Sequence, residues 1–182
     1  MPVIQILDKN FIPFISEAAI AERVAVIADE LNQEFRDRQP LFLAILNGSF
    51  VFAADLFKNI TISAEITFVK LASYQGTSST GSVLTTIGLD KNLRDRDIVL
   101  VEDIIDSGKT LHDFLPQLAS QGIRSLTIVA LLVKPGSIRY PLHIDIAGFE
   151  IDNRFVVGYG LDYDGWGRNL PAIYQLKEED NA

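Results

Sequence analysis

Three apolar runs alternate with segments of helical spacing, and this alternation restricts the chain to few folds. The runs cover residues 41–46, 97–101 and 125–133, and each is followed by polar or glycine-containing residues. Residues 50–57 and 110–120 lie between them and carry apolar side chains at helical spacing. Continuous apolar strands separated by helices are typical of a parallel sheet covered on both faces. We therefore predict an α/β fold with a central, mostly parallel sheet and helices on both faces.

The segments outside these runs complete the expected order of elements. Ser16 is expected to cap a helix over residues 18–35, because its hydroxyl precedes the first apolar positions of helical spacing. Residues 75–81 are rich in Gly, Ser and Thr and are expected to form the loop of a long hairpin, while residues 177–182 form an acidic, frayed tail. Further strands are expected over residues 66–74, 83–87, 144–149 and 155–160.

Composition narrows the possible functions. The 182 residues suit a single domain over residues 1–182, and the lack of cysteine excludes disulfides, thiolate chemistry and zinc–sulfur sites. A net charge of −8 argues against a general nucleic-acid surface. No apolar run reaches about 18 residues, so no association with a membrane is expected. The N-terminus lacks a basic start followed by a long apolar stretch, so we expect no signal peptide and a cytoplasmic protein.

The turn after residues 97–101 carries the clearest chemical signal. A ligand is expected at such a turn because open parallel sheets bind ligands beyond the carboxyl ends of their strands. Two adjacent carboxylates, Glu102 and Asp103, are followed by Asp106 and then by a turn leading into the expected helix. The turn consists of Ser107, Gly108, Lys109 and Thr110. A helix N-terminus offers backbone N–H groups and positive dipole potential, and the turn adds hydroxyl donors, positive charge and a glycine that permits close approach. This pattern predicts a phosphate site.

The three carboxylates need targets other than the phosphate, because they would repel it. Ribose hydroxyls and a sugar loaded with Mg2+ both qualify. The segment is not a Walker A loop, which needs a glycine where Asp103 stands. The structural alternative is a capping aspartate at a helix start with solvated acids at a strand end.

Residues 99–111 resemble the phosphoribosyl pyrophosphate (PRPP)-binding motif of the phosphoribosyltransferases, and the Asp-Ser-Gly-Lys-Thr ending resembles the hypoxanthine-guanine branch. The resemblance implies that Glu102 and Asp103 hold the ribose hydroxyls, directly or through Mg2+. It also implies that the backbone of residues 107–110 cradles the 5′-phosphate and that Asp106 acts as acid/base near N7 of the purine.

Two earlier segments are similar to the same family in the same order. Asn47 and Gly48 resemble the pyrophosphate loop, in which the family has an unusual cis peptide and often a lysine where Asn47 stands. The backbone N–H groups are expected to bind pyrophosphate here, and an ordinary turn is the structural alternative. Ser73 and Tyr74 resemble the start of a mobile loop, about residues 73–84, that closes over the site and excludes water.

Two later segments extend the resemblance over nearly the whole chain. Lys134 matches the lysine that contacts O6 of the base, Phe155 the ring that stacks on the purine, and Val156 the backbone that reads its edge. Asp162 is implied as a Mg2+ ligand and Arg168 as a pyrophosphate contact. Taken singly, these residues have structural alternatives: a snorkelling lysine, a core phenylalanine, a turn aspartate and a surface ion pair. Residues 163–168 depart from the family in having two glycines, and we assign no role to either histidine of the sequence.

The resemblance implies a purine salvage enzyme that joins PRPP to N9 of a 6-oxopurine, hypoxanthine or guanine, and yields IMP or GMP and pyrophosphate. It implies a small hood built from the N-terminal segment and residues 150–178, and a homodimer or homotetramer. A xanthine-preferring enzyme stays open, whereas Asp106 and Lys134 argue against adenine and pyrimidines. A non-catalytic regulator that binds PRPP or RNA is disfavoured by the acidic charge and by the intact Asp106.

Overall fold

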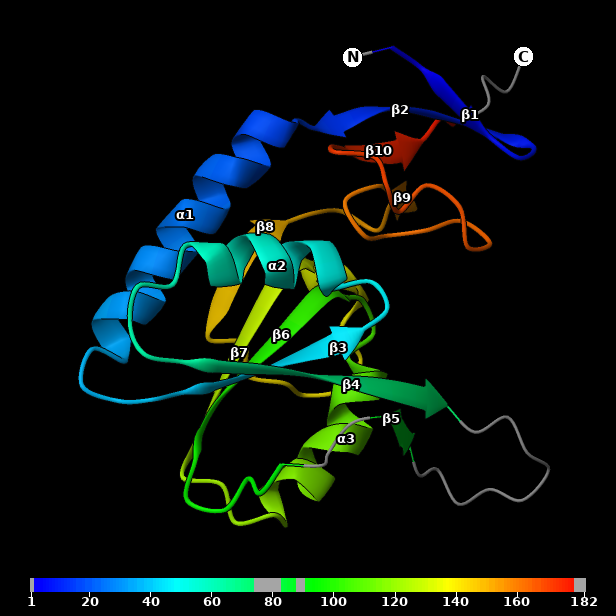
Figure 1. The fold of residues 1–182 in the computed structure, drawn as a ribbon. Helices are drawn as coiled ribbons and strands as arrows, with labels where there is room; N and C mark the ends of the chain where they lie inside the picture. Colours follow the sequence, from blue (N-terminus) through cyan, green and yellow to red (C-terminus); the bar gives the residue numbers. More distant parts are fainter. Residues whose placement is uncertain (1, 74–82, 88–90, 179–182) are drawn as a thin grey trace, which may run out of the picture.

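The computed structural model describes residues 2–73, 83–87 and 91–178, and its larger sheet has the predicted parallel arrangement (Figure 1). The strand order is β5-β4-β3-β6-β7-β8. Five neighbouring strands are parallel, and only β5 runs antiparallel, beside β4. The strands are β3 (Leu41–Leu46), β4 (Glu65–Ser73), β5 (Val83–Ile87), β6 (Asp97–Ile105), β7 (Ser125–Val133) and β8 (Ile146–Glu150).

Helices cover both faces of this sheet, as predicted. Helices α1 (Glu17–Glu34) and α2 (Phe50–Lys58) pack on one face, and α3 (Lys109–Ala119) packs on the other. Side chains alternate along β3: Phe42 and Ala44 join the core under α1 and α2, whereas Leu43 faces the core under α3. The Ser16 hydroxyl accepts a hydrogen bond from the Ala19 N–H at 3.2 Å, so the predicted helix cap is confirmed.

A second, four-stranded sheet forms a hood beside the larger one. Its antiparallel strands are β1 (Ile4–Ile6), β2 (Lys9–Ile15), β9 (Val156–Val157) and β10 (Ile173–Leu176), in the order β1-β2-β10-β9. It has a small core of Phe11, Val157, Ala172 and Tyr174. The hood therefore joins strands from both ends of the chain, as the family resemblance implied, and α1 leads from it to the larger sheet (Figure 1).

Two expected strands differ from the observed ones, and three observed strands were not expected individually. Strand β6 continues to Ile105 because it pairs with β7 as far as Val133, so Glu102 and Asp103 lie inside the strand and not after it. The strand expected over residues 155–160 is only β9, because the next three residues have positive φ angles of 98°, 50° and 98°. The strands β1, β2 and β10 were not predicted individually.

The predicted mobile loop lies mostly outside the described residues. Ser73 ends β4 and Val83 begins β5, while Tyr74 falls in the part that is not described. Within the described ranges, no helix is long and apolar enough to cross a membrane.

Candidate active site

The site is built at one edge of the larger sheet, where three neighbouring strands end. Strands β3, β6 and β7 are adjacent and parallel, so the residues after Leu46, Ile105 and Val133 lie side by side. The Lys134 N–H donates to the Ile105 carbonyl at 2.9 Å and holds the ends of β6 and β7 together. The fold thus brings the predicted pyrophosphate, phosphate and base contacts to one edge.

The predicted phosphate turn lies at the N-terminus of α3. Gly108 caps the helix with a left-handed backbone, φ 78°, and residues 102 and 104–111 line a pocket of about 100 Å³. The Ser107 carbonyl accepts hydrogen bonds from the N–H groups of Arg139 and Tyr140 at 3.1 and 3.3 Å, which ties the turn to the segment after β7. The Lys109 ammonium pairs with Asp113 at 2.6 Å, so an anion at this turn would meet the backbone N–H groups more than this charge.

The acid pair lies between this turn and the loop after β3. Glu102 is 8% exposed, and its Oε2 atom has no hydrogen-bond partner among the described residues. Burial, with the neighbouring Asp103 charge, raises the pKa of Glu102 well above its usual value. Burial also raises the Asp103 pKa to about 6, against the lowering effect of backbone N–H groups and of Arg168. A buried carboxyl with an unpartnered oxygen, Glu102, and a half-buried neighbour with a raised pKa, Asp103, are poised to receive a cation or hydroxyl donors.

Asp106 and Lys134, predicted from separate segments, are in direct contact. The Lys134 ammonium donates to Asp106 Oδ2 at 2.7 Å. Lys134 is 6% exposed, whereas the Asp106 side chain is about half exposed. A snorkelling surface lysine is thereby excluded, because the ammonium is buried with the carboxylate as its partner.

The loop after β3, predicted to bind pyrophosphate, packs directly against the acid pair. The Leu46–Asn47 peptide bond is cis. Gly48 packs on Asp103 so closely that a Cβ atom at Gly48 would lie 1.5 Å from Asp103 Oδ2. Ser49, which the sequence did not single out, is buried, and its hydroxyl donates to the Ile45 carbonyl at 2.5 Å.

Arg168 and Asp162 are paired with each other beside this loop. Arg168 Nη2 lies 2.7 Å from Asp162 Oδ1, and Arg168 Nη1 donates to the Gly160 carbonyl at 2.7 Å. The other oxygen of Asp162 accepts the Gly165 N–H at 2.7 Å. The Arg168 charge lowers the pKa of Asp103, and the Asp162 charge raises it. As the structure stands, Asp162 is an ion-pair partner, and a metal would have to compete with Arg168 for it.

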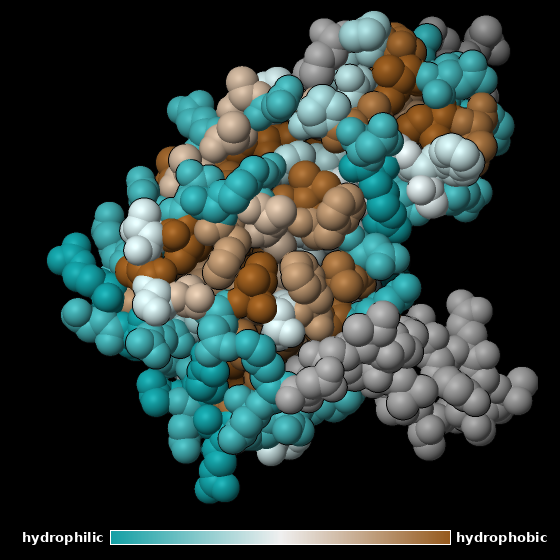
Figure 2. All heavy atoms as spheres, viewed as in Figure 1, coloured by the Kyte–Doolittle hydropathy of each residue, from teal (hydrophilic) through white to brown (hydrophobic). Residues whose placement is uncertain are grey.

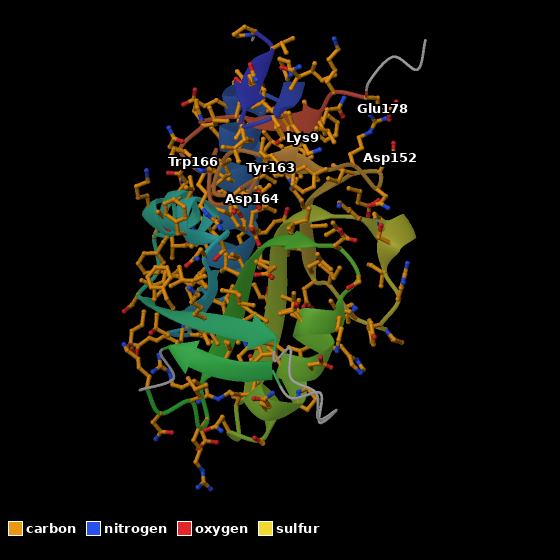
Figure 3. The ribbon with its side chains drawn as sticks, turned by 90° about the vertical axis from the view of Figure 1, so that its right-hand side faces the viewer. Lys9, Asp152, Tyr163, Asp164, Trp166 and Glu178 are labelled. Atoms are coloured by element: carbon orange, nitrogen blue, oxygen red, sulfur yellow. The ribbon has the colours of Figure 1, made fainter. Side chains whose placement is uncertain are left out.

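An aromatic group in the hood surrounds the predicted base-stacking ring. Phe155 is 46% exposed, which excludes a core role, and its ring centroid lies 5.8 Å from Tyr163 and 6.3 Å from Phe11. The Tyr163 hydroxyl donates to Asp8 at 2.8 Å, and the Lys9 ammonium lies 5.7 Å from its ring centroid. Figure 3 shows Lys9 and Tyr163 in the hood, with Asp164 and Trp166 on the loop that carries Tyr163. The supporting residues of this group were missed because they lie far apart in the sequence.

The remaining predicted residues are also placed by the structure. Val156 pairs with Gln175 within the hood sheet, and Asn47 is exposed after the cis peptide. Thr110 is exposed in the first turn of α3. His112 lies against Tyr140, and His143 lies 3.2 Å from Asp145, consistent with their having no assigned role.

The fold is that of an α/β protein whose predicted site residues gather mainly at the carboxyl ends of parallel strands, where open α/β sheets bind ligands. The chain belongs to the phosphoribosyl transferase family, whose domain model matches residues 16–164. It is 42% identical over 164 residues to the hypoxanthine-guanine phosphoribosyltransferase of Bacillus subtilis, covering 90% of this chain and 91% of that protein. It is 36% identical to the hypoxanthine-guanine-xanthine phosphoribosyltransferase of Tritrichomonas foetus, with 87% of each chain covered. The crystal structure of a hypoxanthine-guanine phosphoribosyltransferase from Bacillus anthracis is similar, with a TM-score of 0.86 at 36% identity, covering 91% of this chain and 98% of that one.

Proposed function

We propose that the protein transfers the 5-phosphoribosyl group of PRPP to N9 of hypoxanthine or guanine and releases pyrophosphate with IMP or GMP. The contact between Lys134 and Asp106 carries this proposal. A 6-oxopurine presents an acceptor, O6, beside a donor, the N–H at N7. The pair offers the complementary donor and acceptor 2.7 Å apart. Adenine would set an amino group against the lysine, and a pyrimidine has no N7.

Each residue then has a defined task. The backbone of residues 107–110 holds the 5′-phosphate, and Phe155 stacks on the base with the Val156 backbone at its edge. Asp106 accepts the N7 proton as N9 forms its bond to C1 of the ribose and pyrophosphate leaves. The Gly48 backbone and Arg168 bind the leaving pyrophosphate. To do so, Arg168 leaves its ion pair with Asp162 and pairs with a phosphate oxygen. Catalysis rests mainly on positioning and charge stabilisation.

The acid pair suits Mg2+. Glu102 Oε2 is buried without a hydrogen-bond partner in the described part of the chain. Glu102 and Asp103 would hold the ion. Asp162 would become a further ligand once Arg168 leaves its ion pair with Asp162 to bind pyrophosphate. No group of three His, Asp or Glu side chains converges as a ready metal site among the described residues. Mg2+ usually binds one or two carboxylates together with substrate oxygens and water. When bound, Mg2+ neutralises charge on the pyrophosphate.

Pyrophosphate release from PRPP and Mg2+ with a panel of bases tests the function. We expect turnover with hypoxanthine and guanine, little with adenine, and none in excess EDTA. Xanthine belongs in the panel because one relative's name includes it. Full turnover with EDTA would remove Mg2+ from the proposal, and preference for adenine would contradict the role of Lys134.

We also propose that the protein is a homodimer or homotetramer. Figure 2 shows apolar side chains gathered over the face that carries α1 and α2, and Phe50 and Phe68 are 42% and 37% exposed. Light scattering behind size exclusion tests this, and a monomer at micromolar concentration would contradict it. The cytoplasmic location stays a prediction from the sequence.

A further inference from the structure

A partly buried hydrogen bond joins α2 to the segment that follows β9. The Tyr159 hydroxyl donates to Asp55 Oδ2 at 2.8 Å, across 104 residues of sequence. Tyr159 is 5% exposed and has a left-handed backbone, φ 50°. Burial, together with this bond to Asp55, raises the pKa of Tyr159, so the hydroxyl stays a donor over the working range of pH. None of the roles proposed above uses this pair.

The Tyr159 end of the bond lies in the backbone that orients Arg168. The N–H groups of Tyr159 and Gly160 donate to the carbonyls of Leu170 and Arg168, at 2.8 and 3.0 Å. The Gly160 carbonyl accepts from the Arg168 guanidinium, and a Cβ at Gly160 would lie 2.1 Å from the Gly48 carbonyl. Residues 158–160 therefore touch the loop after β3 on one side and support Arg168 on the other.

The Asp55 end lies on the helix that starts from the same loop. The Ala53 N–H donates to the Ser49 carbonyl at 2.7 Å, so the first turn of α2 is continuous with the loop. The second oxygen of Asp55 pairs with Lys58 at 2.7 Å. A cavity of about 590 Å³ beside the pair is lined by residues of α1, α2 and 168–171. This empty space leaves room for residues 158–160 to shift if the hydrogen bond is lost.

We infer that Asp55 and Tyr159 are positioning residues that hold Arg168 and Asp162 against the pyrophosphate loop, residues 46–49. The inference rests on the proposed function, because it assumes that this loop and Arg168 bind the same pyrophosphate. A small shift between two halves of a binding site is costly, since about 1 Å of misplacement reduces rates by roughly 100-fold. The base contact at Lys134 lies on another element, and Phe155, although on the same segment as Tyr159, is held independently by the Leu176 N–H at 2.8 Å, so both are expected to be unaffected.

Tyr159→Phe tests the inference because it removes the hydroxyl and keeps the packed ring. We expect KM for PRPP, and for pyrophosphate in the reverse direction, to rise about five- to tenfold. KM for hypoxanthine at saturating PRPP is expected to stay within roughly twofold. Asp55→Ala should reproduce the effect, and the double variant should be no worse than either single one. Asp55→Asn should restore near-normal values, because its amide oxygen still accepts from Tyr159.

Lys58→Gln is the matched control, since it removes the other ion-pair partner of Asp55 and leaves Tyr159 untouched. It should have no effect on any KM. Equal rises in KM for PRPP and hypoxanthine, or additive effects in the double variant, would overturn the inference and indicate general loosening. If Tyr159→Phe does not fold, the same test is made by comparing KM for PRPP and for hypoxanthine between Asp55→Asn and Asp55→Ala. A wild-type protein without PRPP turnover would defeat the proposed function itself. If Arg168→Ala raises KM for PRPP and Tyr159→Phe does not, only the positioning role fails.

Discussion

Gly48 is the position where one added carbon atom is expected to disable the site without unfolding the protein. An ideal Cβ at residue 48 would lie 1.5 Å from Asp103 Oδ2 and 2.4 Å from its carboxyl carbon. Since non-bonded heavy atoms need about 3.5 Å, either the loop or the carboxylate must move by roughly 2 Å. Moving the loop displaces the pyrophosphate contacts, and moving Asp103 displaces a ribose and Mg2+ contact.

The expected magnitude follows from that displacement. A misplacement of about 1 Å already costs on the order of 100-fold, so Gly48→Ala should lower kcat/KM for PRPP by at least about 100-fold, or roughly 2.7 kcal/mol. KM for the free base should change far less, because Lys134 and Phe155 are not in contact with Gly48.

Steady-state kinetics in both directions, with thermal unfolding of each variant, is the appropriate assay. Gly136→Ala is the matched control: Gly136 follows β7, and a Cβ there meets no atom within 4 Å. The reasoning is refuted if Gly48→Ala, folded and with a normal melting midpoint, keeps kcat/KM for PRPP close to that of Gly136→Ala.

Three further predictions concern charge. Asp106→Asn should lower turnover by roughly 10²–10⁴-fold while PRPP affinity, measured by calorimetry, is largely kept; near-normal turnover would exclude an acid/base role. Lys134→Ala should weaken hypoxanthine use by about 10- to 100-fold, as expected for a hydrogen bond from a charged donor, and equal losses for PRPP would assign the lysine to a phosphate instead. Because the Asp103 pKa is raised to about 6, PRPP and Mg2+ affinity should fall as the pH drops below about 6, and Asp103→Asn should make this dependence shallower, leaving the part that is due to the raised pKa of Glu102. The effect on the stability of the unliganded protein has the opposite sign. The raised pKa of Asp103 stabilises the fold at acid pH, and this contribution is lost as the pH rises from the ordinary value of 3.8 to about 6. The urea midpoint of the wild type should therefore fall relative to that of Asp103→Asn between these two pH values.

Much of the larger sheet was predictable because its information is local. The apolar runs become β3, β6 and β7, and the site residues follow strands that are neighbours in a parallel sheet. The contact between Asp106 and Lys134 is a consequence of that adjacency, since β6 and β7 end together.

The hood was predictable only from the resemblance, because its pairings are long-range. Strand β2 contains Pro13, and its polar and apolar side chains alternate poorly. Its partner β10 lies about 160 residues further along the chain. The same holds for the supporting contacts: Tyr163 with Asp8 spans 155 residues and Tyr159 with Asp55 spans 104. The sequence around one residue of such a pair does not indicate which distant residue is its partner.

The position of β10 between β2 and β9 has a consequence for the order of assembly during synthesis. The hairpin β1–β2 emerges first from the ribosome, but the strand that pairs with it, β10, is among the last to be made. The phosphate turn and the ends of β6 and β7 have these backbone contacts once Tyr140 has emerged, whereas β9 cannot be anchored beside Phe155 until Leu176 donates to the Phe155 carbonyl. A nascent chain of this protein therefore completes the turn that we propose binds the 5′-phosphate well before the wall on which we propose that the purine rests.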